Sequence, residues 1–410
     1  MAPGILGRFC FGTLLAGALL FAQDAPELSV AEAVSSDRPT RQWLMLRPAG
    51  DETPLPVAVG DRSLSAIDPA RGSVFAIPAG ETLVAAAASR GGARFAVAHT
   101  APADGQWRRL TVIVRDGAGE RRYRISGRYD ADAPMPTLAL SDRGALAVGE
   151  PASGRITLYD DRGAVARTVT LVPDAEYDIE RLLDLTWSRD GERLAAAWTR
   201  RGSAPLGSAA LNPSGKPEAA LFDADGGMMW RAALPGTSLR ALLLSPGGDR
   251  LAVATYAVNV EGPLESRTTI LDERGDALAE FPWMFTHGAF SADGSLLVAG
   301  DTRGVRCVAT ANGESRWSRN IAREEGIAVA SDMSDDGEWT AVLTATSVYA
   351  EGGFRFTAPR LIVTAADGES ELRQDFPEGE FRTPFLRFAP DGRALWLGLS
   401  ATLQRLEVQP

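Results

Sequence analysis

Residues 245–255 read SPGGDRLAVAT, a glycine turn that opens with serine and runs into an apolar strand. Glycine supplies the positive φ of a tight turn, and the apolar run after it predicts a β-strand. A seventh copy of this pattern, in residues 389–392, has alanine for serine. The six copies with serine are Ser89–Gly92, Ser141–Gly144, Ser188–Gly191, Ser245–Gly248, Ser291–Gly294 and Ser334–Gly337.

A second turn lies within each interval between these copies. The second turns are Asp116–Gly119, Asp160–Gly163, Asp223–Gly226, Asp272–Gly275, Ala311–Gly313 and Ala366–Gly368. Two turns per interval give two hairpins, so each interval of 43 to 57 residues holds four strands. Four-stranded units at this spacing are the signature of a β-propeller, in which sheets stack radially and bury both faces of each other. The sequence therefore predicts an all-β fold of four-stranded antiparallel blades.

The copy count predicts seven blades and a closed ring. Residues 63–80 (SLSAIDPARGSVFAIPAG) carry a seventh turn of the second kind, upstream of all the others. We expect these N-terminal strands to join the C-terminal blade, because pairing the two ends leaves no open sheet edge. Residues 41–58 contain a further possible hairpin, so eight blades are the alternative.

The N-terminus has the pattern of an export signal. Arg8 precedes the apolar run from Phe9 to Ala22, which is short for a membrane span. We expect a signal peptide over residues 1–22, a flexible lead-in over residues 23–40 and a single propeller domain over residues 41–410. The protein would then be periplasmic or secreted, with no membrane span after signal removal; an uncleaved anchor is the alternative.

The net charge argues against a nucleic-acid-binding protein, and the cysteine content argues against a fold held by disulfides. The net charge of -11 repels phosphate backbones, so no nucleic-acid partner is expected. After removal of the signal only Cys307 remains, and one cysteine cannot form an internal disulfide. We expect Cys307 to be a small buried residue of a strand.

The repeats resemble those of two groups of propellers. Residues 245–255 and 389–399 (APDGRALWLGL) look like the hairpins of WD-repeat-like and bacterial lactonase-like propellers, and residues 63–80 are similar to the latter. Residues 221–236 and 308–322 look in part like quinoprotein repeats, with tryptophan four residues after glycine. The Trp-Asp dipeptide of true WD repeats is missing, and no quinone-binding residues can be carried over. The resemblance implies the architecture and says little about activity.

Few residues are of the kinds that carry catalysis. The chain has two histidines, and neither has the spacing of a zinc site. The Asp223-x-Asp225-Gly226 stretch superficially has the start of a calcium loop, but its later ligands are missing, so a β-turn is the preferred interpretation. No cofactor is expected. The alternative is calcium in the central channel, for which Asp184 and Asp332 are weak candidate ligands.

We expect binding on the face formed by the links between second and third strands and between blades. Recognition residues commonly lie on loops of a rigid scaffold, and aromatic side chains are typical anchors of interfaces. The candidates are Tyr256, Trp283, Phe285, His287, Tyr349, Phe354, Phe356 and Phe381.

These features favour a non-catalytic scaffold of the bacterial cell envelope. Its partner would be another envelope or extracellular protein, or a small ligand. The alternative is an exported lactonase-like hydrolase, in which inward carboxylates hold a divalent ion that activates water.

Overall fold

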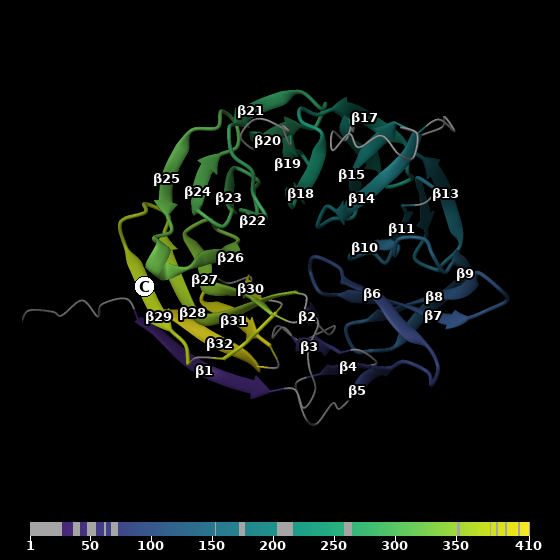
Figure 1. Ribbon diagram of the computed structural model, residues 1–410, viewed down its shortest axis with the longest axis horizontal. Helices are drawn as coiled ribbons and strands as arrows, with labels where there is room; N and C mark the ends of the chain where they lie inside the picture. The colour runs from purple at the N-terminus through teal and green to yellow at the C-terminus, as the bar shows by residue number, and fades with distance from the viewer. Residues whose placement is uncertain are drawn as a thin grey trace, which may run out of the picture.

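The computed structural model is an all-β ring of eight four-stranded antiparallel sheets (Figure 1). It describes residues 27–35, 42–46, 55–60, 63–66, 73–151, 153–171, 177–202, 216–257, 265–350, 353–377, 379–382, 384–389, 392–400 and 402–409. The predicted signal peptide, residues 1–22, lies outside the described residues. One short 3-10 turn, Arg323–Glu325, is the single helical element in the described part of the chain.

In seven sheets the four strands follow one another along the chain, from the innermost strand to the outermost. The first four of these sheets are β2 (Gln42–Leu46), β3 (Leu55–Val59), β4 (Ser63–Ala66) and β5 (Ser73–Ala76); β6 (Thr82–Ala88), β7 (Arg94–Pro102), β8 (Trp107–Asp116) and β9 (Arg121–Asp130); β10 (Thr137–Leu140), β11 (Leu146–Glu150), β12 (Arg155–Tyr159) and β13 (Val165–Thr170); and β14 (Tyr177–Trp187), β15 (Arg193–Gly202), β16 (Lys216–Asp223) and β17 (Met228–Ala233).

The next three sheets have the same order. They are β18 (Ser238–Leu244), β19 (Arg250–Ala257), β20 (Glu265–Asp272) and β21 (Ala277–Phe281); β22 (His287–Phe290), β23 (Leu296–Gly300), β24 (Gly304–Ala309) and β25 (Ser315–Asn320); and β26 (Ile327–Met333), β27 (Trp339–Ala350), β28 (Gly353–Ala365) and β29 (Glu371–Asp375). The last sheet is built from both ends of the chain: β30 (Phe385–Phe388), β31 (Ala394–Leu399), β32 (Thr402–Gln409) and β1 (Glu27–Ser35).

The glycine turns form as their chemistry predicts. Gly248 has φ +74°, and its N–H donates to the carbonyl of Ser245 at 3.0 Å. The Ser245 hydroxyl accepts the N–H of Arg250, the first residue of β19, at 3.0 Å. Serine thus satisfies a backbone donor at the start of the second strand, which explains why it recurs at this position.

The second kind of turn uses aspartate in the same way. Asp223 Oδ1 accepts the N–H groups of Asp225 and Gly227 at 3.0 and 2.6 Å. The carboxylate is therefore engaged by its own turn, which supports the β-turn interpretation of this stretch over a calcium loop.

The closure of the ring differs from the expected pairing. Strand β1 pairs antiparallel with β32, from Glu27 opposite Gln409 to Ser35 opposite Thr402. Residues 63–66 and 73–76 instead pair with each other, and β4 also pairs with β3, so the expectation that residues 63–80 join the C-terminal sheet is wrong. The principle of closure by an N-terminal strand holds, but a different segment supplies it.

The segment that closes the ring was expected to belong to a flexible lead-in. Residues 27–35 (ELSVAEAVS) contain few large apolar groups, and the pattern of a buried strand is absent from them. An outermost strand needs less apolar surface, because only part of it is covered by the sheet beside it. In β1, Leu28 packs half-buried against the cluster that contains Leu406 and Val408.

Residues 42–46 and 55–59 form β2 and β3, so the hairpin that suggested an additional blade is present. Eight sheets fit the eight-bladed alternative better than the seven-bladed interpretation. The last sheet meets the first through a cluster of Ala58, Trp396 and Leu403, which closes the circle. Figure 1 shows β2 beside β30 and β31 at this junction.

Removal of β1 tests this closure. We expect a chain of residues 36–410 to melt at least about 5 °C below a chain of residues 23–410, because β32 loses its partner strand and becomes an open edge. Thermal unfolding followed by circular dichroism measures the difference. Equal melting temperatures would show that β1 contributes nothing to the stability of the ring.

Candidate functional site

The antiparallel strands divide the links of the ring between two faces. In six sheets a serine turn joins the first to the second strand at one end, and the links from second to third strands lie at the other end. The predicted aromatic residues concentrate at the second face. A group of charged residues, which the sequence analysis did not select, lies at the first.

The hairpin of β27 and β28 presents two aromatic side chains to solvent. The predicted loop there is mostly regular strand, with pairing that continues to Ala350 opposite Gly353. Tyr349 and Phe354 are cross-strand partners, 68% and 64% exposed, and their rings pack edge to face with centroids 5.3 Å apart. Single exposed apolar side chains are ordinary, but two large rings packed against each other at the surface form a candidate contact patch.

A second aromatic pair holds the base of this hairpin. Phe356 and Phe381 exchange backbone hydrogen bonds of 2.8 and 3.0 Å, and their ring centroids are 5.5 Å apart. Phe381 is buried and lines a cavity of about 270 Å³ together with Phe376 and Leu399. The exposed pair and this apolar cavity lie on neighbouring parts of the same face.

Two other predicted residues lie in the core. Trp283 and Phe285 belong to the apolar cluster between two neighbouring sheets, and Phe285 is fully buried. The Thr268 hydroxyl donates to the Trp283 carbonyl at 2.7 Å, and the Arg306 guanidinium lies 5.2 Å from the Trp283 ring centroid. These contacts stabilise the packing of the sheets and leave Phe285 no surface for a partner.

Tyr256 and His287 lie at the ends of strands and are half-buried. The Tyr256 carbonyl accepts the N–H of Thr237 at 3.0 Å. His287 Nδ1 and the Ser331 hydroxyl are 2.8 Å apart, which links two sheets. Burial lowers the pKa of His287 to about 4, so its imidazole is neutral at neutral pH.

Both candidate carboxylates line the central channel. Asp184 and Asp332 border one cavity of about 300 Å³, which is enclosed by innermost strands from several sheets. Burial raises the pKa of each carboxyl to about 6. Asp184 accepts the N–H of Leu185 at 2.8 Å, and Asp332 accepts that of Phe388 at 2.7 Å.

The channel also contains arginine, which disfavours a cation there. Arg387 lines the same cavity as the two aspartates, and a guanidinium raises the energy of a divalent ion nearby. Across the described ranges, no group of three or more His, Cys, Asp or Glu residues is placed to hold a metal. Calcium in the channel stays a prediction without support from this geometry.

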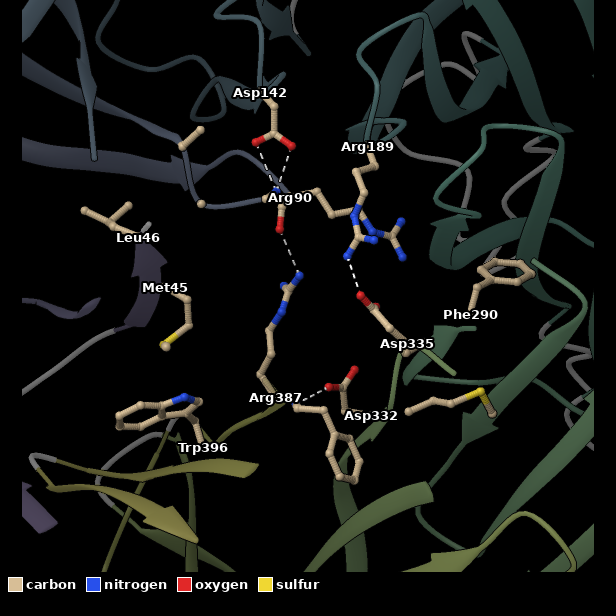
Figure 2. A pocket seen from close by; sticks show the side chains of 16 residues that line it. Met45, Leu46, Arg90, Asp142, Arg189, Phe290, Asp332, Asp335, Arg387 and Trp396 are labelled. Carbon is tan, nitrogen blue, oxygen red and sulfur yellow. Dashed lines mark hydrogen bonds and ion pairs between the residues drawn. The ribbon is translucent and has the colours of Figure 1, made fainter. Parts of the chain in front are cut away.

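Charged residues converge where the serine turns surround the end of the channel (Figure 2). A cavity of about 460 Å³ there is bordered by arginines and aspartates from five sheets. The charged residues are Arg90, Asp142, Arg189, Asp332, Asp335 and Arg387.

The sequence contains a signal for this cluster that the repeat analysis passed over. Arg90, Asp142, Arg189 and Asp335 each follow directly after the serine of a Ser-x-x-Gly turn. The ring brings these turn positions together around one opening, although 245 residues separate the first from the last. A comparison of the second residue of each turn across the repeats would have identified these four charged residues.

Cys307, the one cysteine among the described residues, is where the sequence predicts it. Cys307 is buried in β24, and burial raises the pKa of its thiol to about 11. The thiol is therefore protonated and unreactive at neutral pH. Within the part of the chain that is described, no helix has the length and hydrophobicity to cross a membrane.

Comparison with known structures identifies the architecture. The chain is similar to the C-terminal WD40 domain of Sif2, with a TM-score of 0.55, 11% identity and coverage of 94% of this chain and 99% of that one. It is also similar to the Dos1 propeller, with a TM-score of 0.52, 13% identity and coverage of 93% of this chain and 95% of that one. A chain of the mitotic checkpoint complex is similar with a TM-score of 0.51, 13% identity and coverage of 96% of this chain and 99% of that one. No protein-family model and no curated protein matches the chain. The chain therefore has the fold of a WD40-like β-propeller.

Substitution of Asp184 gives a pH-dependent test of the channel. Because the folded protein holds this proton more tightly than the unfolded chain, whose aspartate pKa is about 3.9, wild-type stability falls as pH rises from about 4 to 6. Asp184→Asn keeps an acceptor for the Leu185 N–H and removes the ionisation. We expect the variant to gain about 2 kcal/mol in free energy of unfolding, relative to wild type, between pH 4 and 7.

Urea unfolding at a series of pH values measures this difference. Asp161→Asn, on an exposed turn, is the matched control and should run parallel to wild type. Other groups such as Asp332 titrate in all three proteins and cancel in the comparison. If the free energies of unfolding of Asp184→Asn and wild type change in parallel with pH, the raised pKa of Asp184 is contradicted.

Proposed function

We propose that this propeller is a non-catalytic scaffold that binds a protein partner through the tip of the β27–β28 hairpin. The observation that carries the proposal is the exposed pair of Tyr349 and Phe354. Aromatic side chains held on a rigid strand pair lose little conformational entropy when a partner covers them. Their backbone is already fixed by cross-strand pairing, so the contact surface is preformed.

The neighbouring cavity suits the same role. The pocket beside Phe381 offers apolar walls of a size that accepts one large side chain from a partner, and the exposed ring pair would then cover the adjoining surface. A similar propeller lies within the mitotic checkpoint complex, so a ring of this fold operates in at least one protein assembly. Among the predicted residues, Tyr349 and Phe354 are exposed at the hairpin, and the buried Phe381 lines the pocket beside them.

A double variant tests the surface without disturbing the ring. We expect Tyr349→Ser/Phe354→Ser to keep the wild-type melting temperature, because both rings are mostly exposed, and to reduce recovery of the partner at least tenfold in affinity capture from cell-envelope extract. The matched control is Met228→Ser/Met229→Ser, which removes two exposed apolar side chains from β17. The proposal fails if every protein captured by wild type is also captured by the aromatic variant.

We also propose that the protein acts in the bacterial envelope or outside the cell, on the basis of the apolar run from Phe9 to Ala22 behind Arg8. In a bacterial host we expect the full chain to appear in the periplasm or medium with Gln23 as its first residue. A chain that lacks residues 1–22 should stay in the cytoplasm. Fractionation with N-terminal sequencing decides the matter, and a full-length chain retained in the cytoplasm or membrane would contradict export.

A further inference from the structure

Three arginines gather at the mouth of the channel bordered by the serine turns. Arg90 and Arg189 come from the turns after β6 and β14, and Arg387 comes from β30. Arg90 Nη1 donates to the Leu244 carbonyl at 2.7 Å, and Arg387 Nη2 donates to the Arg90 carbonyl at 3.1 Å. Figure 2 shows the Arg387 side chain extending into the cavity toward Arg90. Each arginine thus reaches from its own sheet toward another.

Two of these guanidinium groups form no hydrogen bond to a carboxylate within the described ranges, although the charge of Asp332 acts on both. Arg90 and Arg387 each make one hydrogen bond there, in both cases to a backbone carbonyl. A guanidinium has five N–H donors, so most of the donors of both groups remain for a ligand or water. Arg189 differs, since its Nη2 lies 2.8 Å from Asp335 Oδ2.

The nearby carboxylates accept hydrogen bonds from other groups, although the charge of Asp332 also acts on Arg387 and Arg90. Asp142 accepts the N–H of Gly91 with both oxygens at 3.0 Å, and Asp332 accepts the N–H of Phe388. Asp335 is the ion-pair partner of Arg189. These bonds hold the carboxylates against backbone or a third arginine, and they leave Arg90 and Arg387 to face the cavity.

Arg90 lies near two other arginines, and a negative ligand between their guanidinium groups would be attracted to all three. Burial, and after it the charges of Arg387 and Arg189, lower the pKa of Arg90 to about 10, against the smaller opposing effect of Asp332 and Asp335. An oxyanion between the guanidinium groups would relieve this repulsion and fill their vacant donors. The cavity is lined by three arginines and three aspartates, so its preference for an anion would come from the guanidinium donors that face it rather than from an excess of positive charge.

We propose that Arg90, Arg189 and Arg387 bind a small dianionic oxyanion, a phosphate or dicarboxylate group, at this mouth of the channel. The planar guanidinium matches both chemistries, because each presents two oxygens to parallel N–H donors. The cavity of about 460 Å³ has room for a small metabolite that carries such a group. The site lies on the face opposite the β27–β28 hairpin and is independent of the partner proposed there.

Calorimetric titration of the full chain with inorganic phosphate, malonate and chloride tests the site. We expect phosphate or malonate to bind the wild type at concentrations below about 10 mM, and chloride not to bind. The tighter of the two dianions identifies the chemistry of the ligand. Arg387→Gln should weaken binding about tenfold or more, and Arg387→Lys, which keeps the charge but loses the fork, should weaken it less.

Arg303→Gln is the matched control, because Arg303 is an exposed arginine on the link between β23 and β24, at the opposite face. Arg189→Gln provides a second variant of the site if Arg387→Gln does not fold, and melting temperatures without ligand check each variant. The proposal is overturned if neither dianion binds the wild type, or if the folded site variants bind as tightly as Arg303→Gln.

Discussion

The ring depends on one constraint: the second strand of a sheet must be covered on both faces by neighbouring sheets. In β19, Leu251 and Val253 point into one apolar cluster, while Ala252 and Ala254 point into the next, and all four are buried. An open row of such sheets would leave an apolar face exposed at each end. Burial of one leucine or valine side chain is worth about 1.5–3 kcal/mol, so closure of the row into a circle is strongly favoured. Strand β1 and the cluster around Trp396 complete that closure.

The channel is a consequence of the same packing. Innermost strands cannot converge on the axis when eight sheets share a circle, so a space lined by several of them remains. The serine turns surround one end of this space, and their second residue lies where it meets solvent. Residues far apart in the chain therefore become neighbours by virtue of repeat position alone. A charge in this partly buried position is costly unless it is paired or hydrogen-bonded. Asp335 is paired with Arg189, and Asp142 and Arg90 form hydrogen bonds with the backbone.

The four-stranded sheets could be predicted from the sequence because their turns depend on local residues. Gly248 and Asp223 act through their own backbone, independently of the rest of the fold. Closure is a long-range property: β1 is recognisable as a strand only once β32 is beside it, since its own apolar content is low. The same limit applies to the aromatic residues. Phe285 and Phe354 look alike in the sequence, but the packing of neighbouring sheets buries one and leaves the other exposed.

The two faces of the ring differ in the way they present function. At one face an exposed ring pair stands on a long hairpin, supported at its base by the backbone bridge between Phe356 and Phe381. Such a surface is wide and apolar, and it suits a macromolecule. At the other face the arginines line a cavity of about 460 Å³ at the mouth of the channel, with Arg189 and Arg387 open to solvent. Because rigid sheets connect the faces, a ligand at one proposed site could be bound without movement at the other.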